Sequence, residues 1–177
     1  MRDAFLIIEA KVSKLAILLS QKAVKYRNLP AVGRTHGQHA SIMAFGLKFA
    51  VWASEMARHT ERIEQGKKRF LACKTRGVVG TGSLMGNLAL NVEKIVASSL
   101  DLYPVDAATQ VVPRERYAEM QFLIALIGST LDKIAIEVRN LQRTEIAEVA
   151  EPFKKGQMGS SAVPVKRNPI KSERVSA

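Results

Sequence analysis

The stretch that decides the fold runs over residues 41–73 and reads SIMAFGLKFAVWASEMARHTERIEQGKKRFLAC. Large and apolar positions recur in it at alternating steps of three and four residues, which is the period of a helix with one buried face. The positions are Ile42, Phe45, Phe49, Trp52, Met56, His59, Ile63, Gly66, Phe70 and Cys73. The pattern predicts one helix of roughly nine turns, with Ser41 as its N-cap. A helix this long buries a seam against neighbouring helices instead of closing a compact core.

The same alternation predicts further helices on both sides of this stretch. Residues 2–29 repeat it up to Pro30, and residues 113–150 repeat it from Pro113 onward, where proline favours a helix start. A shorter helix is expected at about 84–100. No segment shows the period-two alternation of a strand, so the expected fold class is an all-α bundle of long helices. Three such seams exceed what three helices can bury on one another, which predicts self-association.

Composition restricts the class of protein. The 177 residues, 47% of them hydrophobic, suit a folded globular domain. No apolar run reaches the roughly 20 residues of a membrane span, and residues 1–3 lead directly into a patterned helix without an apparent signal peptide. Cys73 is the only cysteine, so an intrachain disulfide is impossible. We therefore expect a cytoplasmic protein with no membrane partner.

The formal net charge of +11 is concentrated in two segments. Residues 58–76 carry seven Lys or Arg against two Glu, and residues 154–177 carry six against one. Nucleic-acid binding is the generic interpretation of such segments. We rank a solvated helix end first for residues 58–76, and a site for a polyanionic metabolite explains residues 154–177 equally well. A glycine cluster at 77–83 matches neither phosphate-loop spacing, and a tight connection between helices is favoured there.

Helical patterning stops at the segment 156–170, which reads GQMGSSAVPVKRNPI. Glycines and serines let the backbone approach a ligand closely, prolines prevent a helix, and Lys166 and Arg167 add positive charge without any carboxylate nearby. This composition is typical both of a loop that closes over an anion and of a disordered basic tail.

Two motifs resolve that choice by resemblance. Residues 159–169, with the pattern GSSAxPxKxNP, resemble the mobile signature loop of the fumarase/aspartase superfamily, whose members release fumarate from substituted succinates. Residues 33–40, GRTHGQHA, resemble the Thr-His block of the same superfamily. The GQHA ending and the run KRNPIxSE are similar to the adenylosuccinate lyase branch. The resemblance implies a central helical-bundle domain over residues 1–177, with the signature loop at 154–170, in a homotetramer.

The resemblance also implies roles for particular residues in a β-elimination. Ser160 is the candidate base, with Ser161 as its alternative, and its alkoxide would need backbone N–H donors from the Gly159 turn and a nearby cation. His36 is the candidate acid, because an imidazole titrates near neutrality. The expected substrate-binding residues are Thr35, Gln110, Ser161, Lys166 and Asn168. Lys166 and Asn168 are two apart, so in an extended segment they face the same way and Arg167 faces away.

The remaining histidines and the ligand classes complete the expectation. His59 is expected to be a packed core histidine, and His39 to be solvated. The sequence contains no metal-ligand cluster and no cofactor motif, and the implied elimination needs no cofactor. The expected partners are a small-molecule succinyl nucleotide and other copies of the chain, without nucleic acid. Purine nucleotide biosynthesis is the implied pathway, through adenylosuccinate and the succinyl-aminoimidazole-carboxamide ribotide.

The chain departs from the family pattern in two ways. Val163 and Val165 stand where the pattern has methionine and histidine, and Val165 keeps other superfamily activities open, such as an argininosuccinate lyase or a carboxymuconate cycloisomerase. The family's N-terminal and C-terminal domains have no counterpart here. We therefore expect a fragment that is inactive or nearly so by itself. A basic helical nucleic-acid-binding module and a non-catalytic oligomerisation domain are the alternatives from other classes.

Overall fold

The computed structural model describes residues 1–154, 156–163 and 165–177. The chain divides into two compact units, Met1–Ala125 and Leu126–Ala177. Pro164, which belongs to the signature motif, lies outside the described residues, as does Lys155. Among the residues described, none of the helices combines the length and the apolar character that crossing a membrane requires.

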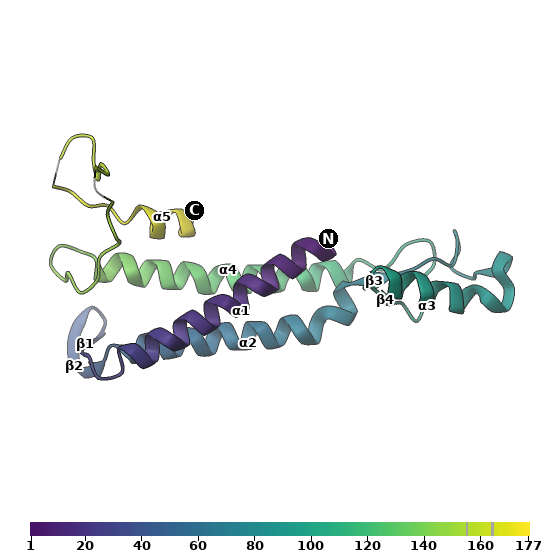
Figure 1. Cartoon of the computed structure of the whole chain (residues 1–177), viewed down its shortest axis with the longest axis horizontal. Coiled ribbons are helices and arrows are strands. Elements are labelled where there is room, and N and C mark those ends of the chain that lie inside the picture. The colour runs from purple at the N-terminus through teal and green to yellow at the C-terminus, as the bar shows by residue number, and fades with distance from the viewer. Residues whose placement is uncertain (155, 164) are drawn as a thin grey trace. The chain divides into compact units, whose positions relative to one another are not determined.

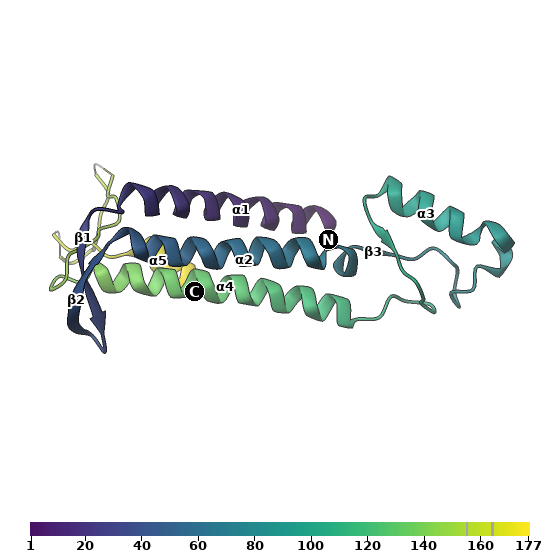
Figure 2. The ribbon, with the colours of Figure 1, turned by 90° about the horizontal axis from the view of Figure 1, so that it is seen from below.

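Two long helices form the body of the first unit. Helix α1 spans Arg2–Lys25 and α2 spans Gly46–Phe70, and they run antiparallel side by side (Figures 1 and 2). Most buried residues of α2 follow the seam that the sequence predicted, whereas Gly46 and Ala53 lie beside it; those on the seam are Trp52, Met56, His59, Ile63, Gly66 and Phe70. The buried residues of α1 are Phe5, Val12 and Leu19. The seven-residue steps on α1 are those of helices packed along a continuous seam.

The structure confirms the prediction that His59 is a packed core histidine. Its side chain is buried on α2, and burial, followed by the charge of Arg62, lowers the pKa of its imidazole. The His59 ring nitrogen Nδ1 lies 3.4 Å from the Arg62 guanidinium. Burial disfavours the charged form of an imidazole, so the neutral form is the one that packs in the seam.

The expectation of a helix beginning at Ser41 was wrong, and short strands depart from the expected all-α fold. Strands β1 (Pro30–Thr35) and β2 (Gln38–Ala44) form an antiparallel hairpin, and Ser41 lies inside β2. Ile42 and Phe45 fit a helical seam by spacing, but Ile42 is 84% exposed. The fold is therefore mostly helical with a few short strands.

Gly46 explains why α2 starts where it does. A Cβ atom at this position would overlap the Ala23 carbonyl oxygen of α1. The Gly46 N–H donates to the Tyr26 carbonyl at 3.0 Å, and the Phe45 N–H donates to the Leu29 carbonyl at 2.7 Å. These contacts fix the start of α2 against the chain that follows α1, and the residues before it pair in the hairpin.

The end of the α1–α2 pair opposite the hairpin carries a small irregular cluster (Figure 2). Strands β3 (Ala72–Cys73) and β4 (Tyr103–Pro104) pair in parallel, and between them lie the 3₁₀ helix η1 (Ser83–Leu88) and α3 (Ala89–Ser99). The expected helix at 84–100 is thus divided by a kink at Gly86, which has φ 52° and ψ −134°. The glycine cluster before it forms a tight connection, as predicted.

Helix α4 spans Glu115–Leu141 and ends nine residues earlier than the expected 150. The chain turns after Leu141, and Ala147 adopts a positive φ of 50°, which a continuing right-handed helix does not permit. Glu145 and Glu148 stand where the apolar seam of α4 would continue by spacing. They fall in this turn region and offer no apolar face to bury. A short helix that the sequence analysis did not anticipate, α5 (Ile170–Ser176), follows the signature loop.

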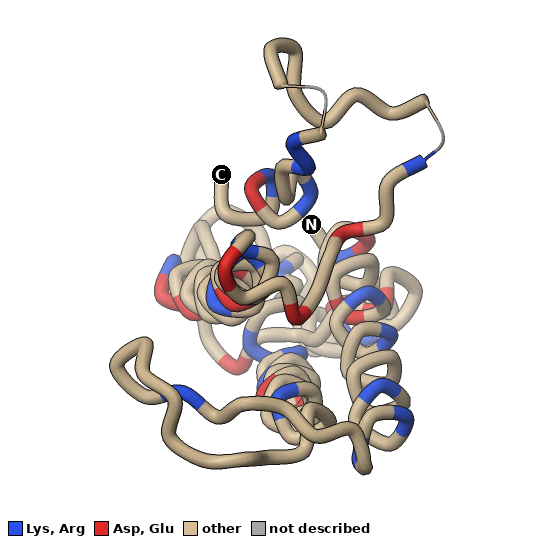
Figure 3. Tube along the Cα trace, turned by 90° about the vertical axis from the view of Figure 1, so that its left-hand side faces the viewer, with Lys and Arg blue, Asp and Glu red and all other residues tan. Residues whose placement is uncertain are grey.

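The basic segment 58–76 is largely engaged within the first unit. Lys67 pairs with Glu9 at 2.7 Å, Arg69 pairs with Glu119 at 2.5 Å, and the last turn of α2 is where a helix dipole favours cations. Figure 3 shows Asp and Glu interspersed with Lys and Arg along the helices. This arrangement favours the interpretation as a helix end over a nucleic-acid surface.

Candidate active-site loops

The candidate acid lies at the tip of the hairpin. Thr35 pairs with Gln38, and the two residues between them, His36 and Gly37, both have positive φ, 54° and 74°. Two consecutive residues with left-handed backbone conformation indicate a type I′ turn, whose twist matches that of the strands it joins. The turn presents the side chains of Thr35 and His36 to solvent. His39, on β2, is also exposed, as the sequence analysis expected.

Gln110 lies at the other end of the first unit. Its carbonyl accepts a hydrogen bond of 3.1 Å from Lys74 Nζ, which also contacts the Gly77 carbonyl. Gly80, at φ 78°, lies so close to the Ala108 carbonyl that a side chain there would overlap it. The glycine cluster thus packs directly against the loop that carries Gln110. The side chain of Gln110 is exposed.

A buried ion pair holds this loop in place. Arg76 and Glu93 are 9% and 1% exposed, and Arg76 Nε lies 3.1 Å from Glu93 Oε2. The Arg76 guanidinium also donates to the carbonyls of Val105 and Asp106, at 2.6 and 3.2 Å. The sequence analysis missed both residues. The one available signal was a glutamate on the buried face of a short apolar helix.

The signature loop lies in the second unit and carries the candidate base, Ser160. Two backbone N–H groups, of Ala162 and Val163, donate to Ser160 Oγ at 3.4 and 3.3 Å. The sequence analysis expected such donors from the Gly159 turn, whereas they come from the residues that follow Ser160. N–H groups directed at an oxygen favour its anionic form. Ser161 beside it is exposed.

Gly159 closes this loop on itself. A Cβ atom at residue 159 would overlap the Lys166 carbonyl oxygen and lie 3.0 Å from the Phe153 ring. Gly159 is buried, so the segment from 159 to 166 is closed at its base by a contact that only glycine permits. The closure places Ser160 next to the chain that carries Lys166.

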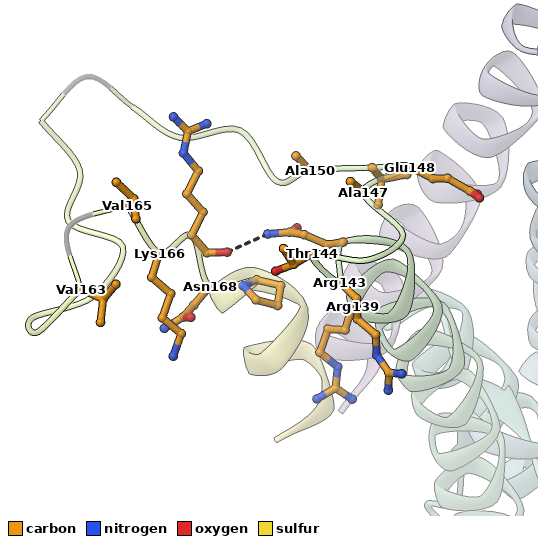
Figure 4. A pocket seen from close by; sticks show the side chains of 14 residues that line it. Arg139, Arg143, Thr144, Ala147, Glu148, Ala150, Val163, Val165, Lys166 and Asn168 are labelled. Atoms are coloured by element: carbon orange, nitrogen blue, oxygen red, sulfur yellow. Dashed lines mark hydrogen bonds between the residues drawn. The ribbon is translucent and has the colours of Figure 1, made fainter. Parts of the chain in front are cut away.

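Lys166 and Asn168 extend from the same side of the chain in Figure 4. Arg167 lies between them in sequence, and its guanidinium stacks over the Phe153 ring at 5.6 Å. The alternation expected for an extended segment is therefore present. An ammonium and an amide on one side are suited to binding one carboxylate together.

A cavity of about 820 Å³ adjoins the loop within the second unit (Figure 4). The end of α4 and the turn after it contribute Arg139, Gln142, Arg143 and Thr144, and the loop contributes Val165, Lys166, Arg167 and Asn168. Among the lining residues that the structure describes, four have cationic side chains, and Glu148 carries the one carboxylate. Such a lining favours an anionic ligand. Neither Arg139 nor Arg143 was predicted from the sequence, because Arg139 lies on α4 and Arg143 in the turn after it, and only the end of the helix at Leu141 brings the two into one lining.

The structure groups the candidate residues in three places. Thr35 and His36 share the hairpin tip, and Ser160, Ser161, Lys166 and Asn168 share the signature loop. Gln110 is bonded to Lys74, which follows the end of α2, whereas the hairpin precedes the start of α2. Since α2 has 25 residues, it is roughly 37 Å long at 1.5 Å per residue. His36 and Gln110 of one copy therefore do not meet at one ligand.

A family model described as "Lyase" matches residues 1–177. The chain belongs to this lyase family. The curated relatives that the chain matches include the adenylosuccinate lyases of Pyrococcus abyssi and Methanocaldococcus jannaschii, at 47% and 46% identity. Each alignment covers 98% of this chain and 39% or 38% of the relative. The chain thus spans about two fifths of the length of the relatives it matches.

Solved structures of other proteins have the same fold over nearly the whole of this chain. The 3-carboxy-cis,cis-muconate lactonizing enzyme from Pseudomonas putida is 34% identical, with a TM-score of 0.86 over 99% of this chain and 39% of that chain. The fumarate lyase from Mesorhizobium sp. BNC1 is 32% identical, with a TM-score of 0.81 over 99% of this chain and 38% of that chain. The resemblance inferred from the two sequence motifs is confirmed by these matches.

Proposed function

We propose that this chain is the central part of an adenylosuccinate lyase, which eliminates fumarate from adenylosuccinate to give AMP. The same reaction would convert the succinyl-aminoimidazole-carboxamide ribotide to its carboxamide. The observation that carries the proposal is the signature loop, in which a serine oxygen receives two N–H donors beside a lysine and an asparagine directed to one side. The 47% identity to a protein named adenylosuccinate lyase supports the choice of substrate.

The proposed reaction begins at Ser160. Its Oγ, as an alkoxide, removes a proton from the carbon beside a carboxylate, and the electron pair becomes a carbanion that this carboxylate stabilises. The two N–H groups at Ser160 Oγ support the alkoxide, and Lys166 supplies a nearby positive charge. Ser161, the alternative base, has no such pair of donors among the hydrogen bonds described for the loop. Exclusion of water by the loop would strengthen each of these interactions.

The remaining residues complete the elimination. The carbanion pair forms the carbon–carbon double bond of fumarate as the carbon–nitrogen bond breaks, and His36 donates a proton to the departing nitrogen. Lys166 and Asn168 hold one carboxylate, and Thr35 and Gln110 bind other polar groups of the substrate. Because His36 and Gln110 are separated by the length of α2, the proposed site is assembled from more than one copy of the chain.

Fumarate release from adenylosuccinate, followed by the formation of AMP, tests this proposal in the full-length protein that contains the chain. Ser160→Ala is expected to reduce turnover by at least about a thousandfold, since it removes the base. The 177-residue chain alone is expected to be nearly inactive in the same assay. Failure of the intact protein to release fumarate from either succinyl nucleotide would refute the assignment.

A cycloisomerase is the second candidate, favoured by two observations. The lactonizing enzyme from Pseudomonas putida matches the fold with a TM-score of 0.86. Val165, which is exposed beside Lys166, also departs from the adenylosuccinate lyase pattern. Incubation of the intact protein with 3-carboxy-cis,cis-muconate distinguishes the two, because this candidate predicts loss of the conjugated diene without any fumarate.

A further inference from the structure

Gln142 connects the two stems of the signature loop. It lies one residue past the end of α4, and both ends of its side-chain amide are hydrogen-bonded. Its Nε2 donates to the Arg167 carbonyl at 3.1 Å, and its Oε1 accepts from the Glu151 N–H at 2.9 Å. Glu151 belongs to the entering stem, the chain just before the loop, and Arg167 belongs to the return stem, the chain between the loop's tip and α5. One amide therefore links helix α4 to both stems.

The Arg167 contact bears directly on the residues proposed to hold the substrate. Arg167 stands between Lys166 and Asn168, and Gln142 fixes the carbonyl of its peptide. Its guanidinium lies over the Phe153 ring, so the backbone and the side chain of Arg167 are both held. In an extended segment this leaves residues 166 and 168 on the other side.

The Glu151 contact secures the other stem. The Glu151 carboxylate accepts hydrogen bonds from the Lys171 and Ser172 N–H groups at 3.0 and 2.7 Å, and from the Ser172 hydroxyl at 2.7 Å. Gln142 thus holds the backbone of Glu151, and the side chain of Glu151 caps the first turn of α5. The return stem is consequently held at Arg167, and the helix α5 that follows it is held at residues 171 and 172.

We propose that Gln142 is a positioning residue, whose side-chain amide sets the register of both loop stems so that Lys166 and Asn168 face one ligand carboxylate. Both polar atoms of its amide are engaged by the loop, so its effect on a ligand passes through Lys166 and Asn168. The identity of the ligand rests on the proposed function, whereas the link between the stems rests only on the hydrogen bonds above. Gln142→Met has a similar volume and removes both bonds. Gln142→Glu keeps the acceptor for the Glu151 N–H and loses the donor to Arg167.

Limited digestion with trypsin under native conditions reads each stem separately, in the intact protein that carries the chain. Lys154 reports the entering stem, and Lys166 and Arg167 report the returning one. Gln142→Met is expected to raise cleavage after all three about tenfold, because two hydrogen bonds no longer oppose local opening. Gln142→Glu is expected to raise it only after Lys166 and Arg167. Gln65→Met, which removes an exposed Gln65–Glu61 bond of 3.0 Å on α2, is the matched control and should behave as wild type.

Unchanged cleavage in Gln142→Met would overturn the proposal. Increased cleavage throughout the chain in both Gln142 variants would overturn it as well, because Gln142 would then stabilise the fold generally. Fumarate release adds a second readout: Gln142→Met should raise KM for adenylosuccinate about tenfold, and an unaltered KM would contradict a role in positioning Lys166 and Asn168. A wild-type protein that releases no fumarate refutes the proposed function alone, since the digestion result is independent of it.

Discussion

At some positions of this chain the absence of a side chain matters as much as a functional group does elsewhere, because it permits a close backbone contact. Gly159 is the clearest case, because its missing side chain lets the Lys166 carbonyl approach. Ser160 and Lys166, the proposed base and cation, thereby come from the two sides of one closed loop. A residue without a functional group thus determines whether the functional groups are neighbours.

Gly159→Ala is accordingly expected to open the loop. The added methyl would overlap the Lys166 carbonyl oxygen, and relieving an overlap of this kind costs about 1–3 kcal/mol. Turnover of the intact enzyme should fall at least about tenfold. Gly128→Ala is the matched control, because nothing lies within 4 Å of a Cβ atom at Gly128 and alanine is the better helix former by about 1 kcal/mol. Equal turnover in the two variants would show that the close approach is unimportant.

Glu151 predicts a dependence of stability on pH. Burial by itself raises the pKa of its carboxyl, but the Ser172 and Lys171 hydrogen bonds and the Lys171 charge together hold the pKa below its ordinary value of 4.5. A carboxyl with a lowered pKa in the folded state contributes stability that is complete above the unfolded pKa. That contribution is lost as pH falls through the folded pKa.

Urea unfolding of the wild type and of Glu151→Gln from pH 7 to pH 3 measures this contribution. At pH 7 the variant should be less stable by about 1 kcal/mol, and the difference should shrink toward acid pH. Glu145→Gln, at an exposed position, should show little difference at any pH. A Glu151→Gln difference that stays constant over the whole range would exclude the carboxylate as the source.

Among the elements, the helices were predictable and the hairpin was not. The seams of α1 and α2 recur at helical spacing over many turns, so their burial follows from the period alone. The start of α2 depends instead on tertiary contacts, since Phe45 and Gly46 bond to the chain at the end of α1, and helical spacing alone does not reveal them. Arg76 and Glu93 escaped notice for the same reason: they are 17 residues apart and meet only in the folded unit.

The hairpin turn offers a test of His36 that preserves its backbone. Asparagine is favoured at the left-handed first position of an Asn-Gly type I′ turn, so His36→Asn should retain the turn while removing the imidazole. Turnover is expected to fall roughly 10²–10⁴-fold, the usual contribution of a general acid, with circular dichroism unchanged. His39→Asn, on the adjacent strand, should keep wild-type turnover. Wild-type turnover in His36→Asn would remove His36 from the mechanism.

The buried ion pair of the irregular cluster predicts a large effect on stability. Glu93→Gln keeps the shape of the side chain and leaves the Arg76 charge without its carboxylate, which costs about 3 kcal/mol for a pair as buried as this one. Glu115→Gln, which removes an exposed partner of Arg116, should change stability by less than about 0.5 kcal/mol. Equal unfolding free energies for the two variants would contradict the assignment of Arg76 and Glu93 as an anchor.

At the scale of the whole molecule, the two long helices of the first unit carry exposed apolar side chains. Ile7, Ile17 and Val24 of α1 are each 61% exposed, and Leu47 and Val51 of α2 are 53% and 48% exposed. Exposed apolar side chains along two long helices favour packing against other copies. The predicted tetramer remains a prediction, and the separation of His36 from Gln110 gives it a functional reason.

Subunit mixing tests whether the site is shared between copies. His36→Asn and Gln110→Glu each damage every site when expressed alone, since the first removes the acid and the second places a carboxylate against a dianionic substrate. If a site draws His36 from one copy and Gln110 from another, random assembly of equal amounts leaves about a quarter of the sites with both residues intact. Co-expression should therefore restore about a quarter of the wild-type rate of fumarate release. If both residues served a site from the same copy, every site would keep one damaged residue and no activity would return, in conflict with the roughly 37 Å helix that separates them.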